Sequence, residues 1–109
     1  ERNDVIAMFR SAIEGIKKRG NSDLGDKTLL DALIPAVDQL EKCFNEGNDT
    51  DLALEQAAIV ARQAAEATRP MIAKRGRAAY TGERSIGTLD AGAVAIAVLF
   101  EAVAKSWKG

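Results

Sequence analysis

The chain has 109 residues, which suits one small domain, and 47% of them are hydrophobic, which argues against intrinsic disorder. A net charge of −1 argues against a general nucleic-acid binder, and no apolar run reaches the roughly 18–20 residues of a membrane span. The absence of histidine excludes histidine-based acid–base catalysis from this chain, and the single cysteine, Cys43, excludes an internal disulfide and favours a reducing, cytoplasmic setting.

The first predicted helix covers residues 4–19. Its apolar side chains recur at steps of three and four and form one stripe: Val5, Phe9, Ala12, Ile13 and Ile16. Basic residues crowd its last turn, where cations suit the helix dipole, and Gly20 is a good helix stop.

The stretch that follows has almost the spacing of a phosphate-binding P-loop. Four residues lie between Gly20 and Gly25, and Lys27-Thr28 follow, but Asp26 separates the second glycine from the lysine. A P-loop also follows a strand, whereas this stretch follows a helix. We therefore predict a helix over residues 27–45 with Asp26 as its N-cap, and a kink where Pro35 interrupts it.

Two more helices are predicted in the second half of the chain. Residues 50–69 carry many alanines, whose small side chains allow close packing, and Pro70 ends the pattern. Residues 91–108 follow Asp90, a good N-cap, and are apolar on nearly every side, so we expect this helix to be buried on most sides. The pattern predicts an all-α antiparallel bundle of four helices, with further neighbours needed to cover the last one.

A basic, glycine-rich stretch at residues 69–93 separates the last two helices. Arginine is well suited to phosphate, so residues 72–89 are predicted to be a long phosphate-contacting loop. A solvated basic loop, with Glu83 and Arg84 as an internal ion pair, is the alternative. The start of the next helix has two readings as well: Gly92 could admit a ligand close to the backbone, or Asp90 could simply cap the helix.

Taken in order, these segments resemble one family. The series "RG-x4-GDKT-x2-D" from Arg19 to Asp31, then Pro35, then "RGRAAYTGERSIGTLDAGA" at 75–93 is similar to the nucleotide-binding L subunit of dihydroxyacetone kinase, which is also the C-terminal part of single-chain dihydroxyacetone kinases. The resemblance covers nearly all of residues 1–109 but only the C-terminal half of the family domain, a barrel of eight antiparallel helices. It implies that four helices here form half of that barrel.

The resemblance also implies which residues meet the nucleotide. Gly20 and Leu29 match positions that line its pocket, Arg77 matches a phosphate contact, and Asp90, Ala91 and Gly92 match a bordering Asp-Pro-Gly segment in which Ala91 replaces proline. The stretch that resembles the lid over the nucleotide contains Lys74, Arg75, Gly76, Tyr80, Gly82, Glu83, Arg84 and Ser85. No catalytic residue and no metal ligand is assigned here, because the aspartate-rich loop that holds magnesium belongs to the absent N-terminal half.

The activity implied is phosphoryl transfer to dihydroxyacetone held by a separate K subunit or domain. In one branch of the family ADP stays bound and is rephosphorylated by a phosphotransferase-system protein, and in the other ATP exchanges as a substrate. The fragment alone is expected to be inactive without its N-terminal half. Two alternatives remain open: a self-associating helical module, for example a homodimer, and a related kinase of the fatty-acid type. Neither nucleic acid nor membrane is an expected partner.

Overall fold

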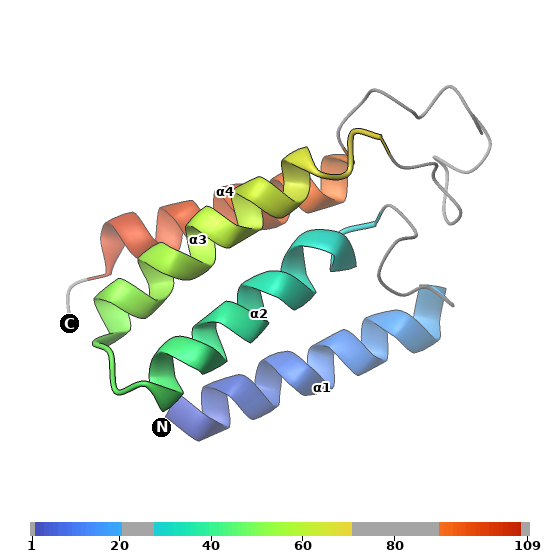
Figure 1. The fold of residues 1–109 in the computed structure, drawn as a ribbon. Coiled ribbons are helices and arrows are strands. Elements are labelled where there is room, and N and C mark those ends of the chain that lie inside the picture. The colour runs from blue at the N-terminus through green and yellow to red at the C-terminus, as the bar shows by residue number, and fades with distance from the viewer. Residues whose placement is uncertain (1, 21–27, 71–89, 108–109) are drawn as a thin grey trace.

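The computed structural model describes residues 2–20, 28–70 and 90–107, and this part of the chain is all-α. The four helices are α1 (Arg2–Gly20), α2 (Leu30–Asn45), α3 (Thr50–Glu66) and α4 (Ala91–Ser106). They run alternately up and down, as Figure 1 shows, which confirms the predicted antiparallel bundle. None of the described helices combines the length and the apolar character that crossing a membrane requires.

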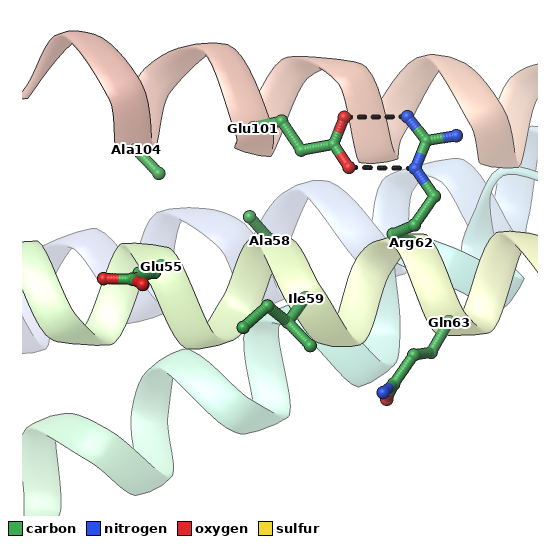
Figure 2. Close-up of a pocket in the computed structure, with 7 residues that line it drawn as sticks. All are labelled: Glu55, Ala58, Ile59, Arg62, Gln63, Glu101 and Ala104. Atoms are coloured by element: carbon green, nitrogen blue, oxygen red, sulfur yellow. Dashed lines mark hydrogen bonds and ion pairs between the residues drawn. The ribbon is translucent and has the colours of Figure 1, made fainter.

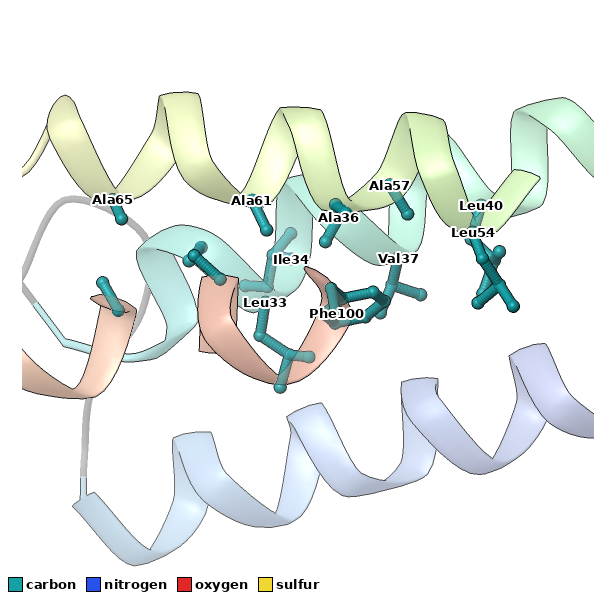
Figure 3. Packing of buried hydrophobic residues seen from close by; sticks show 14 of the residues in the cluster. Leu33, Ile34, Ala36, Val37, Leu40, Leu54, Ala57, Ala61, Ala65 and Phe100 are labelled. Atoms are coloured by element: carbon teal, nitrogen blue, oxygen red, sulfur yellow. The ribbon is translucent and has the colours of Figure 1, made fainter. Parts of the chain in front are cut away.

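Helix α2 lies at the centre and contacts the other three helices. Its partner α3 contacts it, and in Figure 3 the fully buried Ala57, Ala61 and Ala65 of α3 lie over Ala36 of α2; Ala32 of α2 is equally buried. We call these five residues the alanine seam. Small side chains let two helix backbones approach closely, so the alanine-rich sequence of α3 serves packing, as predicted.

Helix α1 is held at the side of α2. Its buried side chains Ile6 and Ile13 face the core, and the guanidinium of Arg10 contacts both Asp38 and Glu41 on α2, at 2.8 Å each. Phe9 also stacks on Phe100 of α4, with ring centroids 6.0 Å apart. These contacts join α1 to α2 and to α4.

Two predictions about α2 need correction or comment. The helix begins at Leu30 and not at residue 27, so the predicted cap Asp26 does not precede its first turn; Asp26 itself lies outside the described residues. The helix runs through Pro35 as one element. Pro35 has no N–H to donate to the carbonyl of Asp31, and its ring crowds the same carbonyl.

The predicted burial of α4 was wrong for the described part of the chain. Only Ala93, Ala97 and Phe100 are buried, while Val98 and Leu99 are 52% and 55% exposed. In this part of the chain α4 packs on α2 and α3 with one side only, so the opposite apolar side stays uncovered. Helix α3 also ends earlier than predicted, at Glu66, and a turn follows it as far as Pro70.

Candidate functional site

The up-and-down order brings four widely separated segments to one end of the bundle. Helix α1 ends there at Gly20, α2 begins there after Leu29, α3 ends there before Thr68, and α4 begins there after Asp90 (Figure 1). We call this the site end. All the sequence-predicted nucleotide residues that the structure describes, namely Gly20, Leu29, Asp90, Ala91 and Gly92, lie at the site end.

The start of α2 is fixed by two backbone N–H groups that donate to the side chains of Thr28 and Asp31. The hydroxyl of Thr28 accepts a hydrogen bond from the N–H of Leu30 at 3.2 Å, and the carboxylate of Asp31 accepts one from the N–H of Thr28 at 2.9 Å. The pair resembles a capping box of the Thr-x-x-acid type, set one residue before the N-cap position at Leu29, and it satisfies amides that a helix start leaves without partners. The sequence carries the signal, "TLLD", but the prediction placed the cap at Asp26 instead.

The start of α4 is capped as predicted. Asp90 is extended, with φ −70° and ψ 125°, and its carboxylate accepts a 2.8 Å hydrogen bond from the N–H of Ala93. The next residue, Ala91, is exposed at the first position of the helix. The cap reading of this segment is therefore confirmed, whereas contact with a ligand remains a prediction.

The sequence suggested that Gly92 leaves room for a ligand, but in the structure the residue close to Gly92 is Leu29. A β-carbon placed on Gly92 would lie 3.1 Å from the β-carbon of Leu29, 3.4 Å from the backbone nitrogen of Leu29 and 3.2 Å from the Asp90 carboxylate. The space beside Gly92 is thus filled by the start of α2. Two segments that the resemblance assigns to one pocket, around Leu29 and around Gly92, are in direct contact.

Sequence reasoning missed one residue at this end, Thr68. Its side chain is fully buried, and its hydroxyl both donates to the carbonyl of Ala65 at 2.6 Å and accepts from the N–H of Asp90 at 2.9 Å. The second bond joins residues 22 positions apart. No local pattern announces such a contact, although a threonine placed just before Arg69-Pro70 at a helix end is a mild indication of a side chain that serves the turn.

The remaining predicted residues lie outside the described part of the chain. These are Arg77 and the lid residues Lys74, Arg75, Gly76, Tyr80, Gly82, Glu83, Arg84 and Ser85. Within the described residues, no three side chains of histidine, cysteine, aspartate or glutamate come together in a way that could hold a metal ion. The described residues therefore do not fit a magnesium site.

A groove of about 380 Å³ lies elsewhere, between α3 and α4 (Figure 2). The guanidinium of Arg62 holds both carboxylate oxygens of Glu101, at 2.8 Å and 2.7 Å. This hydrogen bonding raises the pKa of Arg62 and lowers the pKa of Glu101. Each group meets its charge partner within the protein, which is typical of a structural link between two helices.

Comparison with known proteins gives several relatives. A 37% identity over 105 residues relates the chain to the ADP-binding subunit DhaL of the PEP-dependent dihydroxyacetone kinase of Escherichia coli strain K12, and covers 96% of this chain and 50% of that subunit. The L-erythrulose 1-kinase of Mycolicibacterium smegmatis is 42% identical over 99 residues, 91% of this chain and 17% of that protein. A probable dihydroxyacetone kinase of Dictyostelium discoideum is 40% identical over 105 residues, 91% of this chain and 16% of that protein.

The chain therefore spans about half the length of the DhaL subunit that it matches and a smaller share of the longer kinases. The profile of the DAK2 domain matches residues 1–105. The match extends over all four helices and over both segments whose motifs carried the resemblance. The chain belongs to the DAK2 domain family.

Proposed function

We propose that this chain is the C-terminal half of the nucleotide-binding domain of a kinase that phosphorylates dihydroxyacetone or a similarly short hydroxyketone. The relatives named above are an ADP-binding subunit, a probable dihydroxyacetone kinase and an erythrulose kinase, which supports a kinase role and leaves the acceptor within this class. A fatty-acid kinase role is less well supported, because the three relatives named above carry the names of dihydroxyacetone or erythrulose kinases.

The observation that carries the proposal is the convergence at the site end. Leu29 on one helix start and Asp90 to Gly92 on another are far apart in sequence but meet in space, with Leu29 against Gly92. Apolar Leu29 suits a contact to a nucleotide base. The exposed first turn of α4 at Ala91 suits the approach of a polar ligand.

The reaction proposed is transfer of a phosphoryl group from ATP to a hydroxyl of the acceptor, with ADP left bound or released. Catalysis of this kind rests on positioning and on neutralising phosphate charge. Arg77 would contact phosphate. Magnesium would neutralise phosphate charge, and its protein ligands would lie in the N-terminal half of the domain. The acceptor would be held by a K subunit or domain, and a phosphotransferase-system protein would recharge ADP in one branch of the family. We place the complete enzyme in the cytoplasm.

Isothermal titration tests the nucleotide role. We expect the complete subunit to bind ADP with magnesium tightly and the 109-residue chain to bind it weakly or not at all. Tight binding by this chain alone would contradict the assignment of magnesium ligands to the other half. Absence of binding by the complete subunit would contradict the function itself.

Kinetic measurements test the predicted phosphate contact. In the complete subunit, Arg77→Ala should lower phosphoryl transfer, because a cationic phosphate contact is lost. Lys42→Ala is the matched control, because Lys42 is an exposed cation in the last turn of α2, at the opposite end of that helix from Leu29. Equal kinetics for the two variants would remove Arg77 from the site.

A second candidate role is association, and the uncovered side of α4 favours it. Val98, Leu99 and Val103 are apolar and exposed on this helix. Exposed apolar patches of this kind mark contact surfaces. We propose that the side binds further helices, either the N-terminal half of the domain or a second copy of the chain. Sedimentation of the isolated chain tests this, and a stable monomer over a wide concentration range would count against self-association.

A further inference from the structure

Two buried polar side chains stand out in the described part of the chain, Asp31 and Thr68. Both lie at the site end, and each holds the start of a helix: Asp31 bonds to the N–H of Thr28 before α2, and Thr68 bonds to the N–H of Asp90 before α4. Buried polar groups with satisfied hydrogen bonds give a unique, rigid arrangement. The rest of the described core is apolar, so this kind of rigidity is concentrated at the site end.

Thr68 uses its hydroxyl in both directions. A hydroxyl has one proton to donate, and the short 2.6 Å bond to the carbonyl of Ala65 takes it. The lone pairs then remain for the N–H of Asp90, at 2.9 Å. The direction of both bonds is therefore fixed, and the last turn of α3 is joined through one oxygen atom to the residue that caps α4.

The Thr68 hydrogen bonds also affect the residues predicted to meet the nucleotide. With its N–H held by Thr68 and its carboxylate held by the N–H of Ala93, Asp90 is fixed at both its backbone and its side chain. Gly92 follows two residues later and lies against Leu29. Thr68 thus joins the first turn of α4 to the end of α3, at the place where Gly92 lies against Leu29 at the start of α2.

We propose that Thr68 is a positioning residue for nucleotide binding: its hydroxyl holds Asp90, Ala91 and Gly92 at the place where the nucleotide is bound. This inference rests on the proposed function. Thr68 does not touch the ligand itself, since it is fully buried behind Asp90. A valine would fill the same volume but would leave the Asp90 N–H without its partner, while the Ala65 carbonyl would keep the 3.1 Å hydrogen bond from the backbone N–H of residue 68; a serine would keep both hydroxyl bonds.

The alternative, that Thr68 only stabilises the fold, is separated by a matched core variant. Val37 is fully buried in α2. Val37→Ala removes apolar volume from the core without touching a hydrogen bond of the site end. Thr68→Val, Thr68→Ser and Val37→Ala are prepared in the complete subunit, and three quantities are measured for each: Tm, the Kd for ADP with magnesium by titration calorimetry, and the exchange rate of the Asp90 amide proton by NMR.

We expect Thr68→Val to speed exchange at Asp90 and to raise the Kd by about tenfold, the scale of one lost buried hydrogen bond. Thr68→Ser should stay close to wild type in both, and Val37→Ala should lower Tm with the Kd unchanged. If Thr68→Val and wild type have equal Kd values, the inference about Thr68 is wrong but the proposed function stands. The same holds if Val37→Ala raises the Kd as much as Thr68→Val does. A wild-type subunit that bound no ADP would overturn the proposed function as well.

Discussion

Leu29 lies so close to Gly92 that a β-carbon on the glycine would come within 3.1 Å of the leucine β-carbon. Real β-carbons very seldom come that close to a neighbour, so the absence of a side chain at Gly92 is what lets the starts of α2 and α4 touch. The two close atoms of Leu29, its β-carbon and its backbone nitrogen at 3.4 Å, cannot swing aside, and the Asp90 carboxylate oxygen at 3.2 Å is held by the N–H of Ala93. The contact therefore couples two backbones.

Gly92→Ala should lower the free energy of unfolding by about 1–3 kcal/mol, the usual cost of forcing an extra methyl group into packed surroundings. The start of α2 must move to relieve the contact with Leu29, so nucleotide affinity should fall too. Urea denaturation and calorimetric titration of the complete subunit measure both effects.

Gly15→Ala is the matched control for this change. Gly15 lies inside α1, and a β-carbon there would meet no atom within 4 Å. Alanine is a better helix former than glycine, so the same substitution should stabilise by about 0.5–1 kcal/mol at this position. If both Gly→Ala variants change the free energy of unfolding in the same direction, close contact between Leu29 and Gly92 is contradicted.

Thr28→Ala should destabilise the protein by about 1 kcal/mol, because the capping hydroxyl of α2 is lost and the N–H of Leu30 loses its partner. Thr28→Ser keeps the hydroxyl and should stay within a few tenths of a kcal/mol of wild type. Thermal unfolding followed by circular dichroism measures the difference. If alanine and serine behave alike, Thr28 is not the cap.

Ala61→Leu should destabilise by about 1–3 kcal/mol or prevent folding, because Ala61 is fully buried in the alanine seam and the larger side chain would push α3 away from its neighbours. The matched change Ala7→Leu adds the same volume at an exposed position of α1 and should stay within about 0.5 kcal/mol of wild type. Denaturant unfolding of the pair measures how far the two costs differ, and similar costs would contradict close packing at the seam.

The Arg62–Glu101 ion pair predicts a small dependence of stability on pH. Hydrogen bonding to Arg62 lowers the pKa of Glu101 below its usual 4.5. The pair therefore contributes stability above about pH 4.5, and this contribution is lost as the pH falls through the lowered pKa of the folded state. Both side chains are more than a third exposed, so the contribution should be only about 0.5 kcal/mol.

Glu101→Gln should reduce the stability difference between pH 6 and pH 3 by that amount, as measured by urea unfolding at each pH. Glu14→Gln is the control, since the side chain of Glu14 is 66% exposed and its 3.5 Å contact is with Lys17 in the same helix. A pH dependence that is the same in wild type and Glu101→Gln would show that the pair contributes nothing.

The helices were predictable from the sequence because their signals are local. The stripe along α1, the alanines of α3 and the cap at Asp90 each lie within a few residues of what they determine. The start of α2 was misplaced for the same reason: Asp26 and Thr28 both look like caps, and local pattern alone does not choose between them. The capping box with Asp31 decides for Thr28.

What the sequence could not predict depends on contacts between distant residues. The burial of α4 was overestimated because the apolar character of Val98 and Leu99 does not show which neighbouring helices are present to cover them. Thr68 was missed because its partner Asp90 stands 22 positions away. Gly92 was recognised as special, but only the structure places Leu29 beside it.

The alanine seam has a consequence for how this protein can evolve. Alanine is the smallest residue that still carries a β-carbon, so at Ala57, Ala61 and Ala65 most substitutions add volume, and glycine weakens the helix. At a leucine-rich interface, substitutions can make side chains slightly larger or slightly smaller. At these three positions neither kind of small change in side-chain volume is readily tolerated. Descendants of this sequence should change α3 at its outer positions and keep these three alanines, or else alter α2 at the same time.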